Sequence, residues 1–493
     1  MWRWPVALPH PLTFQNVTGR IIKPHPTVSG AACQQPRVDL IAILSGIVSQ
    51  KNSLACTYAD NLSIPTFLLR HSVIKFRLDL SSLHGRSEMR KFLMATAAAA
   101  LTAGTAIAGS HSGEIKIGVI LGFTGPLETI TPSMGLGAEL AMKEVTASGK
   151  LLDGATVTPV RGDSTCIDAA AATAAAERLI TSDKVDAIMG ADCSGVTGAI
   201  LQNVARPNGI LMVSPSATSP ALSTAEDDGL FFRTAPSDAR QGVVMTENIM
   251  DRGFKSVALT YTNNDYGKGL ADSFQAAFEA AGGTVTVSAA HDEDKADYSA
   301  EVGALASAGG EILVVAGYAN GAGTQIIQGS LDTGAFDTFV LPDGMVGQDI
   351  VDKIGPDLTG SFGQYPGTDS KGADMFVAMA LGASLNNPAE AFGGSDAFAP
   401  ESYDAAALIM LAMQAAGSTD SAAVKEHIMA VANAPGEPIM PGELGKALDM
   451  IKAGKDIDYV GATAVELIGP GESAGNYREI EIKDGAVATV AFR

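Results

Sequence analysis

The chain has 493 residues, of which 46% are hydrophobic and 18% are charged, and its formal net charge is −21 at pH 7. This length predicts two or three domains with substantial cores, which excludes a disordered or fibrous chain. The charge is uneven, because residues 1–88 carry a net charge of +5 and residues 109–493 carry −28. So acidic a body repels phosphate backbones, and nucleic acid is not expected as a partner.

Residues 89–108 have the features of a secretory signal peptide. Arg90 and Lys91 form a short basic segment, an alanine-rich apolar stretch follows, and Ala106 and Ala108 form a small-x-small cleavage site. A membrane-spanning helix is the alternative, but the apolar run is short and no basic flank follows it. We therefore expect translation to begin at Met89, residues 1–88 to be an extension from a misassigned start, and the product to be soluble in the periplasm.

From residue 114 onward, apolar runs typical of buried strands alternate with segments of helical period. The expected strands are 115–121, 156–160, 185–189, 210–213, 256–261, 284–289, 312–315 and 338–341. The expected helices are 135–147, 168–181, 196–206, 238–252, 267–281, 298–308, 321–331, 402–416 and 421–432, and an extended segment follows at 479–492. This alternation predicts α/β architecture with parallel sheets covered on both faces, and a break at 230–236 divides it into two doubly wound lobes.

The loops that follow the predicted strands are where ligands bind in open α/β sheets. The loop after the first strand has no G-x-G-x-x-G, and no P-loop occurs anywhere, so neither a dinucleotide nor a nucleoside triphosphate is indicated. Ser194 is expected to cap the helix after the third strand, and a hydroxyl-rich turn at 214–220 follows the fourth. These groups could receive an anion, but an ordinary cap and an ordinary turn explain the same spacing.

One enzyme motif matches the sequence, but its flanking residues do not fit the structure that the motif requires. Residues 471–475 satisfy G-x-S-x-G, with Ser473 as the nucleophile, but Gly469 and Pro470 precede it where a strand is needed. His427 is the last histidine, so the downstream base of a hydrolase is missing. The histidines and cysteines of the body are too few and too far apart for a metal set, so no metal and no cofactor are expected.

Two cysteines belong to the body of the chain. Cys166 and Cys193 each lie just past a predicted strand at the same edge of the first lobe. In an exported chain this placement predicts a disulfide between them.

Several short motifs occur in order along residues 114–493. They are the first strand with the following Thr124-Gly-Pro, Cys193-Ser194, the run 210–218, Phe232-Arg-Thr, Tyr266-Gly-Lys-Gly-Leu and Ala316-Gly-Tyr. In this order and spacing they resemble the periplasmic substrate-binding proteins of branched-chain amino-acid (Leu/Ile/Val-type) ABC importers. The resemblance implies the type I periplasmic binding fold, in which two Rossmann-like lobes are joined by three crossovers, placed near Arg233, Gly363 and Gly475. Lobe 1 would then comprise 114–232 and 364–474, and lobe 2 would comprise 233–363 and 475–493.

The resemblance also implies a ligand site between the lobes, closed by a hinge motion. Ser194 and Thr218, with the backbone at Ser216 and Ala217 beside them, would bind the α-carboxylate of an amino acid. Tyr318 and Asp343 would bind its ammonium group, and Tyr266 would line the cleft from the second lobe. The implied partners are a small-molecule ligand and the permease subunits of an ABC transporter, and the receptor would be a monomer.

Two acids depart from the pattern of the leucine-type receptors. Glu128, in a longer first loop at 125–135, stands where those proteins have an aromatic residue near the ligand side chain. Asp192 replaces a residue that is usually apolar. Both weaken the case for a purely aliphatic ligand, so amides, polyamines, urea-like compounds and aromatic acids stay open.

The leading interpretation is a non-enzymatic solute receptor that delivers its ligand to an importer. A ligand-sensing regulator with the same fold is an alternative, although such proteins are usually cytoplasmic or fused to a signalling segment. A serine hydrolase is the third candidate, which the missing histidine argues against.

Overall fold

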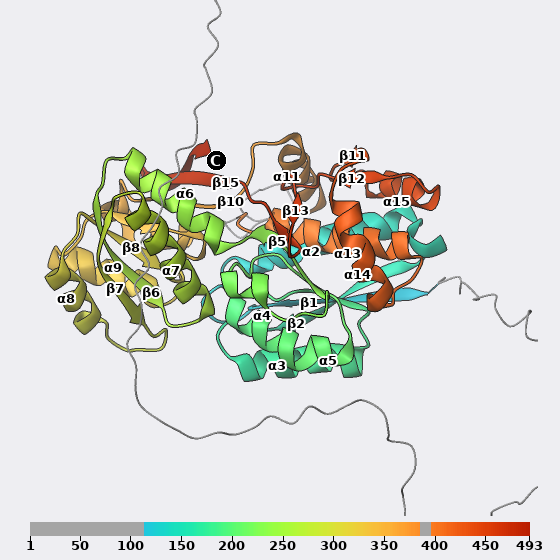
Figure 1. Cartoon of the computed structure of the whole chain (residues 1–493), viewed down its shortest axis with the longest axis horizontal. Helices are drawn as coiled ribbons and strands as arrows, with labels where there is room; N and C mark the ends of the chain where they lie inside the picture. Colours follow the sequence, from blue (N-terminus) through green and yellow to red (C-terminus); the bar gives the residue numbers. More distant parts are fainter. Residues whose placement is uncertain (1–112, 385–395) are drawn as a thin grey trace, which may run out of the picture. The chain divides into compact units, whose positions relative to one another are not determined.

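The computed structural model describes residues 113–384 and 396–493, all within one compact unit of the chain, Thr96–Arg493. The expected extension 1–88 and signal peptide 89–108 lie outside the described residues. Two α/β lobes are built around two seven-stranded sheets (Figure 1). The expected fold of two doubly wound lobes is confirmed.

The first lobe has the sheet order β13-β14-β5-β4-β3-β1-β2, in which every pair is parallel except β13 with β14. Its strands are β1 (Glu114–Leu121), β2 (Thr156–Asp163), β3 (Ala187–Gly190), β4 (Met212–Ser214), β5 (Phe231–Pro236), β13 (Leu467–Ile468) and β14 (Glu472–Ser473). The inner strands β3, β4 and β5 are buried along their whole length, as expected for parallel strands covered on both faces, whereas β2 is a partly exposed edge strand.

Helices cover both faces of this sheet. They are α2 (Thr131–Ser148), α3 (Ala169–Arg178), α4 (Ser194–Ile200), α5 (Arg206–Asn208), α11 (Lys371–Ser384), α13 (Ala399–Ala416), α14 (Ser421–Ala432) and α15 (Leu444–Lys452). α3, α4 and α5 lie on one side of the sheet, whereas α2 and α13 lie on the other (Figure 1). A small separate sheet pairs β11 (Glu437–Ile439) with β12 (Ile457–Tyr459).

α13 is apolar almost all round because it packs against α2, α14 and α15 as well as β3, β4 and β5. It also carries two buried acids, Glu401 and Asp404. A helix in this position is part of the core, so each of its polar side chains needs a specific explanation.

The second lobe has the order β16-β15-β10-β9-β8-β6-β7, parallel from β10 to β7, with β15 and β16 added antiparallel. Its strands are β6 (Ser256–Thr262), β7 (Thr284–His291), β8 (Ile312–Ala316), β9 (Phe339–Leu341), β10 (Phe362–Pro366), β15 (Tyr477–Lys483) and β16 (Ala486–Phe492). Its helices are α6 (Asp238–Asp251), α7 (Asp265–Ala280), α8 (Ser299–Ala308), α9 (Ala322–Thr333) and α10 (Gln348–Ile354). α6 packs on α7, and α8 packs on α9.

The chain passes between the two sheets three times. The passages follow Pro236, Pro366 and Ser473, where β5, β10 and β14 end. Arg233 and Gly363, near which two crossovers were expected, therefore lie inside strands, three residues before each passage. Gly475 lies within the third passage, between β14 and β15.

Eight strands and nine helices expected from the sequence are present, with shifted ends. The expected break at 230–236 is instead a buried strand, β5, and the extended segment expected at 479–492 is a hairpin of β15 and β16. α10, α11 and α15 were not expected. Throughout residues 113–384 and 396–493, no helix has both the length and the apolar composition needed to cross a membrane.

Candidate functional site

The site lies where the strand order of each sheet reverses. In the first sheet β1 lies between β2 and β3, and in the second sheet β6 lies between β7 and β8. Loops that leave the carboxyl ends of neighbouring strands diverge at such a point and leave a crevice. The two crevices face each other, because one cavity is lined by loops of both sheets.

This cavity has a volume of about 20 Å³, which is room for about one water molecule in this conformation. Its lining residues are Leu127, Ile130, Asp192, Cys193, Ser194, Ser216, Tyr266, Tyr318, Asp343, Gly344 and Phe398. Two of the eleven are acids, and Lys, Arg and His do not occur among them. A ligand bound here must therefore supply positive charge or hydrogen-bond donors of its own.

The wall from the first lobe carries the hydroxyl groups. Ser194 begins α4 after an extended Cys193, so it is the first helical residue rather than the cap we expected, and its Oγ accepts a hydrogen bond from Ser219 N at 3.0 Å. The Ser194 hydroxyl keeps its own proton for a ligand oxygen. Thr218 is buried outside the cavity lining, and its Oγ1 has no hydrogen-bond partner among the described residues. Of the two hydroxyls, that of Ser194 lines the cavity and can donate to a carboxylate there.

Ser216 and Ala217 contribute less than we expected. The amides of both residues point at Ser214 Oγ, at 3.3 and 2.9 Å, and the Ser216 hydroxyl donates to the carbonyl of Asp192 at 3.0 Å. Ser216 lines the cavity, whereas Ala217 is buried outside its lining. Their backbone N–H groups shape the loop and are not free to bind a carboxylate in this conformation.

Arg233 holds the loop that follows β4 in place, a role that the sequence did not reveal. The side chain is 1% exposed, and its Nη1 donates to the carbonyls of Ala217 and Ser219 at 2.8 and 2.9 Å. Its Nη2 pairs with Glu472 of β14 at 2.5 Å. A buried guanidinium with these partners holds the receiving loop against the third crossover.

The wall from the second lobe combines two tyrosines with an acid. Asn264 caps α7 by accepting from Gly267 N at 3.0 Å, which places Tyr266 in the first turn, and its Nδ2 donates to the Tyr318 hydroxyl at 3.1 Å. The two rings stack with centroids 5.4 Å apart. Burial raises the pKa of both tyrosines, so their hydroxyls stay protonated.

Asp343 follows β9, and its side chain is held in place by two donors. Tyr266 Oη donates to Asp343 Oδ1 at 2.6 Å, and the amide of Gly344 donates to the same atom at 2.9 Å. Burial raises the pKa of Asp343 despite these bonds. A cationic group that enters the cavity would therefore find a preorganised acid that lacks a cationic partner.

A second acid lies behind the cavity. Asp238, at the start of α6, is completely buried, and neither of its carboxylate oxygens has a hydrogen-bond partner among the described residues. Burial, and then the charge of Asp343, raise its pKa well above the ordinary value. The two acids are thus close enough to disfavour simultaneous ionisation.

The structure places the site residues expected from the sequence as follows. The cavity brings together Ser194, Ser216, Tyr266, Tyr318 and Asp343, whereas Thr218 and Ala217 lie behind its lining. Glu128 is exposed and outside the lining, where its Oε1 accepts from Asn320 Nδ2 of the second lobe at 3.0 Å. Asp192, expected only as a departure from the family pattern, lies in the lining itself.

The apolar part of the cavity was not anticipated. Leu127 and Ile130 come from the loop before α2, and Phe398 comes from the start of α13, more than 250 residues later. Phe398 has φ = 59°, in the left-handed region that bulky residues rarely adopt. No local signal in the sequence marks a residue that reaches a site from so distant a segment.

The expected disulfide is present. Cys166 and Cys193 are bonded across 27 positions, with Cα atoms 5.1 Å apart. Since Cys193 also lines the cavity, the bond ties the loop after β2 to the loop that carries Asp192 and Ser194.

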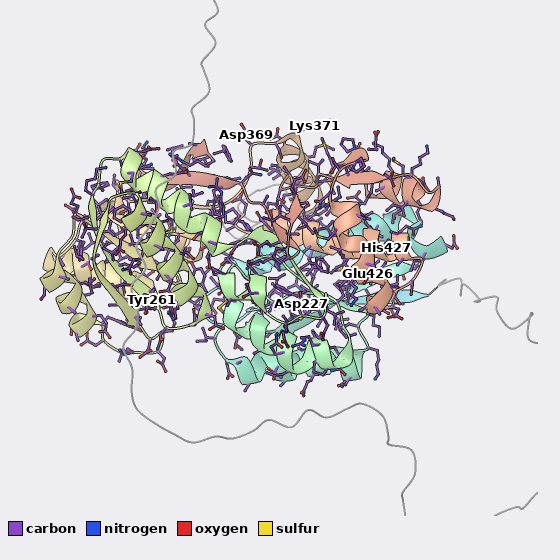
Figure 2. The ribbon with its side chains drawn as sticks, in the orientation of Figure 1. Asp227, Tyr261, Asp369, Lys371, Glu426 and His427 are labelled. Carbon is purple, nitrogen blue, oxygen red and sulfur yellow. A yellow bond between two sulfur atoms is a disulfide. The ribbon has the colours of Figure 1, made fainter. Side chains whose placement is uncertain are left out.

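The G-x-S-x-G match has no nucleophile elbow around it. Ser473 lies in the two-residue strand β14, which leads into β15 and not into a helix. His427 lies on α14 (Figure 2). Across the described residues, no three His, Cys, Asp or Glu side chains gather as metal ligands.

Comparison with known proteins completes the assignment. The chain matches the family model described as periplasmic binding protein over residues 114–446. It is 30% identical over 334 residues to the Leu/Ile/Val-binding protein homolog 3 of Brucella melitensis, an alignment that covers 67% of this chain and 86% of the relative.

Solved structures have the same fold. The leucine binding protein LivK of Thermotoga maritima superposes with a TM-score of 0.64 at 23% identity, covering 77% of this chain and 98% of that one. A solute binding protein of an R. palustris ABC transporter, in complex with 4-hydroxybenzoate, gives 0.62 at 20% identity, covering 77% and 97%. The sequence match and the two-lobe architecture agree, and the chain belongs to the periplasmic binding protein family.

Proposed function

We propose that this protein captures a small α-amino acid between its lobes and delivers it to the permease of an ABC importer. One observation carries the proposal: the cavity has hydroxyl donors on one wall and a buried acid on the other. A zwitterion needs both at once, and only a closed cleft supplies them together.

Each charged end of an amino acid has a matching group. The carboxylate would accept from Ser194 Oγ in the cavity lining, and Thr218 Oγ1, which is buried outside the lining, is the second expected donor. The ammonium would donate to Asp343, with the Tyr318 hydroxyl beside it. Ion pairing of Asp343 with this ammonium would offset the cost of burying both charges.

The names of similar proteins support an amino acid but leave its identity open. The Brucella relative is named for Leu, Ile and Val, and the Thermotoga neighbour for leucine. The R. palustris neighbour holds 4-hydroxybenzoate, which has a carboxylate and no ammonium. An acid such as Asp343 gives no stabilisation to a ligand of that second kind, and it repels the ligand's charge.

The test removes one charged end of the ligand at a time. Protein unfolded in guanidinium with its disulfide intact, then refolded to remove bound ligand, is melted with each natural amino acid. For the best one, the N-acetyl derivative lacks the ammonium and the methyl ester lacks the carboxylate. At a hundredfold excess over Kd, the free amino acid should add about 2.7 kcal/mol of unfolding free energy, and neither derivative should add a measurable amount. An N-acetyl derivative or a benzoate that stabilises as well as the amino acid would contradict the proposal.

Export and delivery complete the proposed function. The segment 89–108 would direct the chain to the periplasm, and the closed form would dock on a permease. Cleavage near Gly109 removes Trp2 and Trp4, the only tryptophans of the sequence. Exported protein should therefore show no tryptophan emission, and an intact mass that retains residues 1–88 would contradict the processing step.

A further inference from the structure

Asp192 occupies the one position in the cavity where the first lobe places a charge. It follows β3, is 1% exposed, and lines the cavity together with Leu127, Ile130 and Cys193. Its field reaches the second lobe, because it raises the pKa of Tyr318 across the cleft. Asp192 therefore stands at the boundary between the cavity, which it lines, and the interior of the first lobe, where Gly122 and Ser164 contact its carboxylate.

Donors of the first lobe fix the Asp192 carboxylate. The amide of Gly122 donates to Oδ2 at 2.9 Å, and Ser164 Oγ donates to Oδ1 at 2.8 Å. A side chain at Gly122 would place its Cβ 3.0 Å from Oδ2 and 3.1 Å from Cys166, so the contact depends on glycine. The backbone amides of Asp192 and Cys193 also lower the pKa of this carboxyl, although burial raises it more.

The charges around the cavity are unbalanced for a simple amino acid. A zwitterion pairs its ammonium with Asp343 and its carboxylate with hydroxyls, which leaves Asp192 beside the ligand side chain. An aliphatic side chain there would cover a buried carboxylate without pairing it, which is costly.

We propose that Asp192 binds a second cationic group on the ligand, so that this receptor selects α-amino acids whose side chain ends in an ammonium. The inference rests on the proposed amino-acid receptor and names its substrate class. Such a ligand would pair one acid on each wall, Asp343 with the α-ammonium and Asp192 with the distal one.

Isosteric probes test the assignment. L-norvaline and L-2,4-diaminobutyrate differ only in a terminal methyl or ammonium group, as do L-norleucine and L-ornithine. Affinities of ligand-free wild type would be measured by calorimetry. In at least one pair the ammonium member should bind about tenfold to a hundredfold more tightly, the effect of one charged hydrogen bond.

Two variants assign the effect to the side chain. Asp192→Asn keeps an acceptor for Gly122 N and can donate to Ser164, so the loop is retained while the charge is lost, and the preference for the ammonium member should disappear. Glu128→Gln is the matched control, because Glu128 is exposed and contacts Asn320 outside the cavity lining. It should leave the preference unchanged.

The possible results distinguish the role of Asp192 from the proposed receptor function. Equal or tighter binding of the neutral members by wild type overturns the role of Asp192 but leaves the amino-acid receptor intact, and this result needs no variant. A preference that persists in Asp192→Asn and is lost in Glu128→Gln assigns the selectivity to Glu128 instead. If neither these probes nor any natural amino acid binds wild type, the proposed function fails first and this inference with it.

Discussion

Asp404 and Asp192 are buried acids of the same lobe, yet their surroundings differ. Asp404, on α13, accepts four hydrogen bonds, from Tyr459 Oη (2.7 Å), Ala462 N (2.8 Å) and both the amide and the hydroxyl of Thr463 (2.9 and 2.7 Å). Asp192 accepts one bond on each oxygen and faces the cavity. Burial raises the pKa of both, to about 6 for Asp404.

The difference lies in what surrounds each acid. Asp404 lies away from the cavity among donors of the chain itself, so its carboxylate stabilises the fold. Asp192 lines the cavity, where a ligand can add a further partner. By this criterion Asp343 belongs with Asp192, and mutations should affect binding at these two positions and stability at Asp404.

The largest effect is expected at Asp343. Asp343→Asn removes the countercharge of the ligand ammonium and should cost about 3 to 5 kcal/mol of binding free energy, as when a buried ion pair loses one member. The melting temperature of the ligand-free protein should hardly change, because the acid has no cationic partner there. Calorimetry with the best natural amino acid and a melt without ligand measure the two quantities. Full affinity in the variant would place the ammonium elsewhere.

The second largest effect is expected for the disulfide between Cys166 and Cys193, which adjoins Asp192 and should contribute to stability. Replacing Cys166 and Cys193 by serine opens a loop of 27 residues, which should lower the unfolding free energy by about 3 to 4 kcal/mol. Urea unfolding of the variant and of wild type gives the difference. In native wild type, alkylation without reduction should modify neither cysteine, and labelling of either would show that the bond is absent.

Whether an element could be predicted from the sequence depends on how far apart in the chain its interacting residues lie. Strands such as β1 and β8 were predicted because parallel strands buried on both faces are continuously apolar. β5 was missed because it carries Arg233 and ends in proline, and the partner that makes this arginine tolerable, Glu472, lies 239 positions away. From the neighbouring residues alone, the segment that contains this arginine was predicted to be a boundary between lobes and not a strand.

The same limit applies to the site. Ser194, Tyr318 and Asp343 follow strand ends, so topology and family motifs together located them. Glu128 was expected near the ligand but lies outside the cavity lining, since loop length does not reveal which way a side chain turns, and Phe398 comes from a different part of the chain. Asp192 was noticed as an unusual acid, but only the three-dimensional structure shows that it lines the cavity and that Gly122 and Ser164 hold its oxygens.

Asn substitutions at the two acids of the comparison give the most direct contrast. In Asp404→Asn an NH₂ group replaces one carboxylate oxygen and faces N–H or O–H donors of the chain. These buried donors lose their acceptor, so the unfolding free energy should fall by about 2 to 3 kcal/mol. Ligand affinity should stay the same. Asp192→Asn should do the reverse, with a stability change within about 1 kcal/mol and altered ligand preference. Urea unfolding and calorimetry on both variants check this, and a stable Asp404→Asn would remove the basis of the distinction.

The smallest effect concerns Glu401, one turn before Asp404 on the same helix. Its Oε2 has no hydrogen-bond partner within the described part of the chain, and burial, reinforced by the charges of Asp404 and Asp396 and opposed by Arg478, raises its pKa from 4.5 to about 8. Between these two values the folded state binds more protons than the unfolded state, so this residue makes the unfolding free energy fall as pH rises.

Glu401→Gln should remove that slope. Between pH 6 and pH 7 the wild type should lose about 1 kcal/mol relative to the variant, because one extra proton must be released by the folded state. Asp404 is present in both proteins, but its charge also raises the pKa of Glu401, so the two curves are compared above pH 6, where Asp404 is mostly ionised. Urea unfolding of the two proteins from pH 5 to pH 8 provides the curves. If the unfolding free energies of the two proteins change with pH in parallel, Glu401 is ionised in the folded protein and has a partner there. Burial would then not keep this acid neutral.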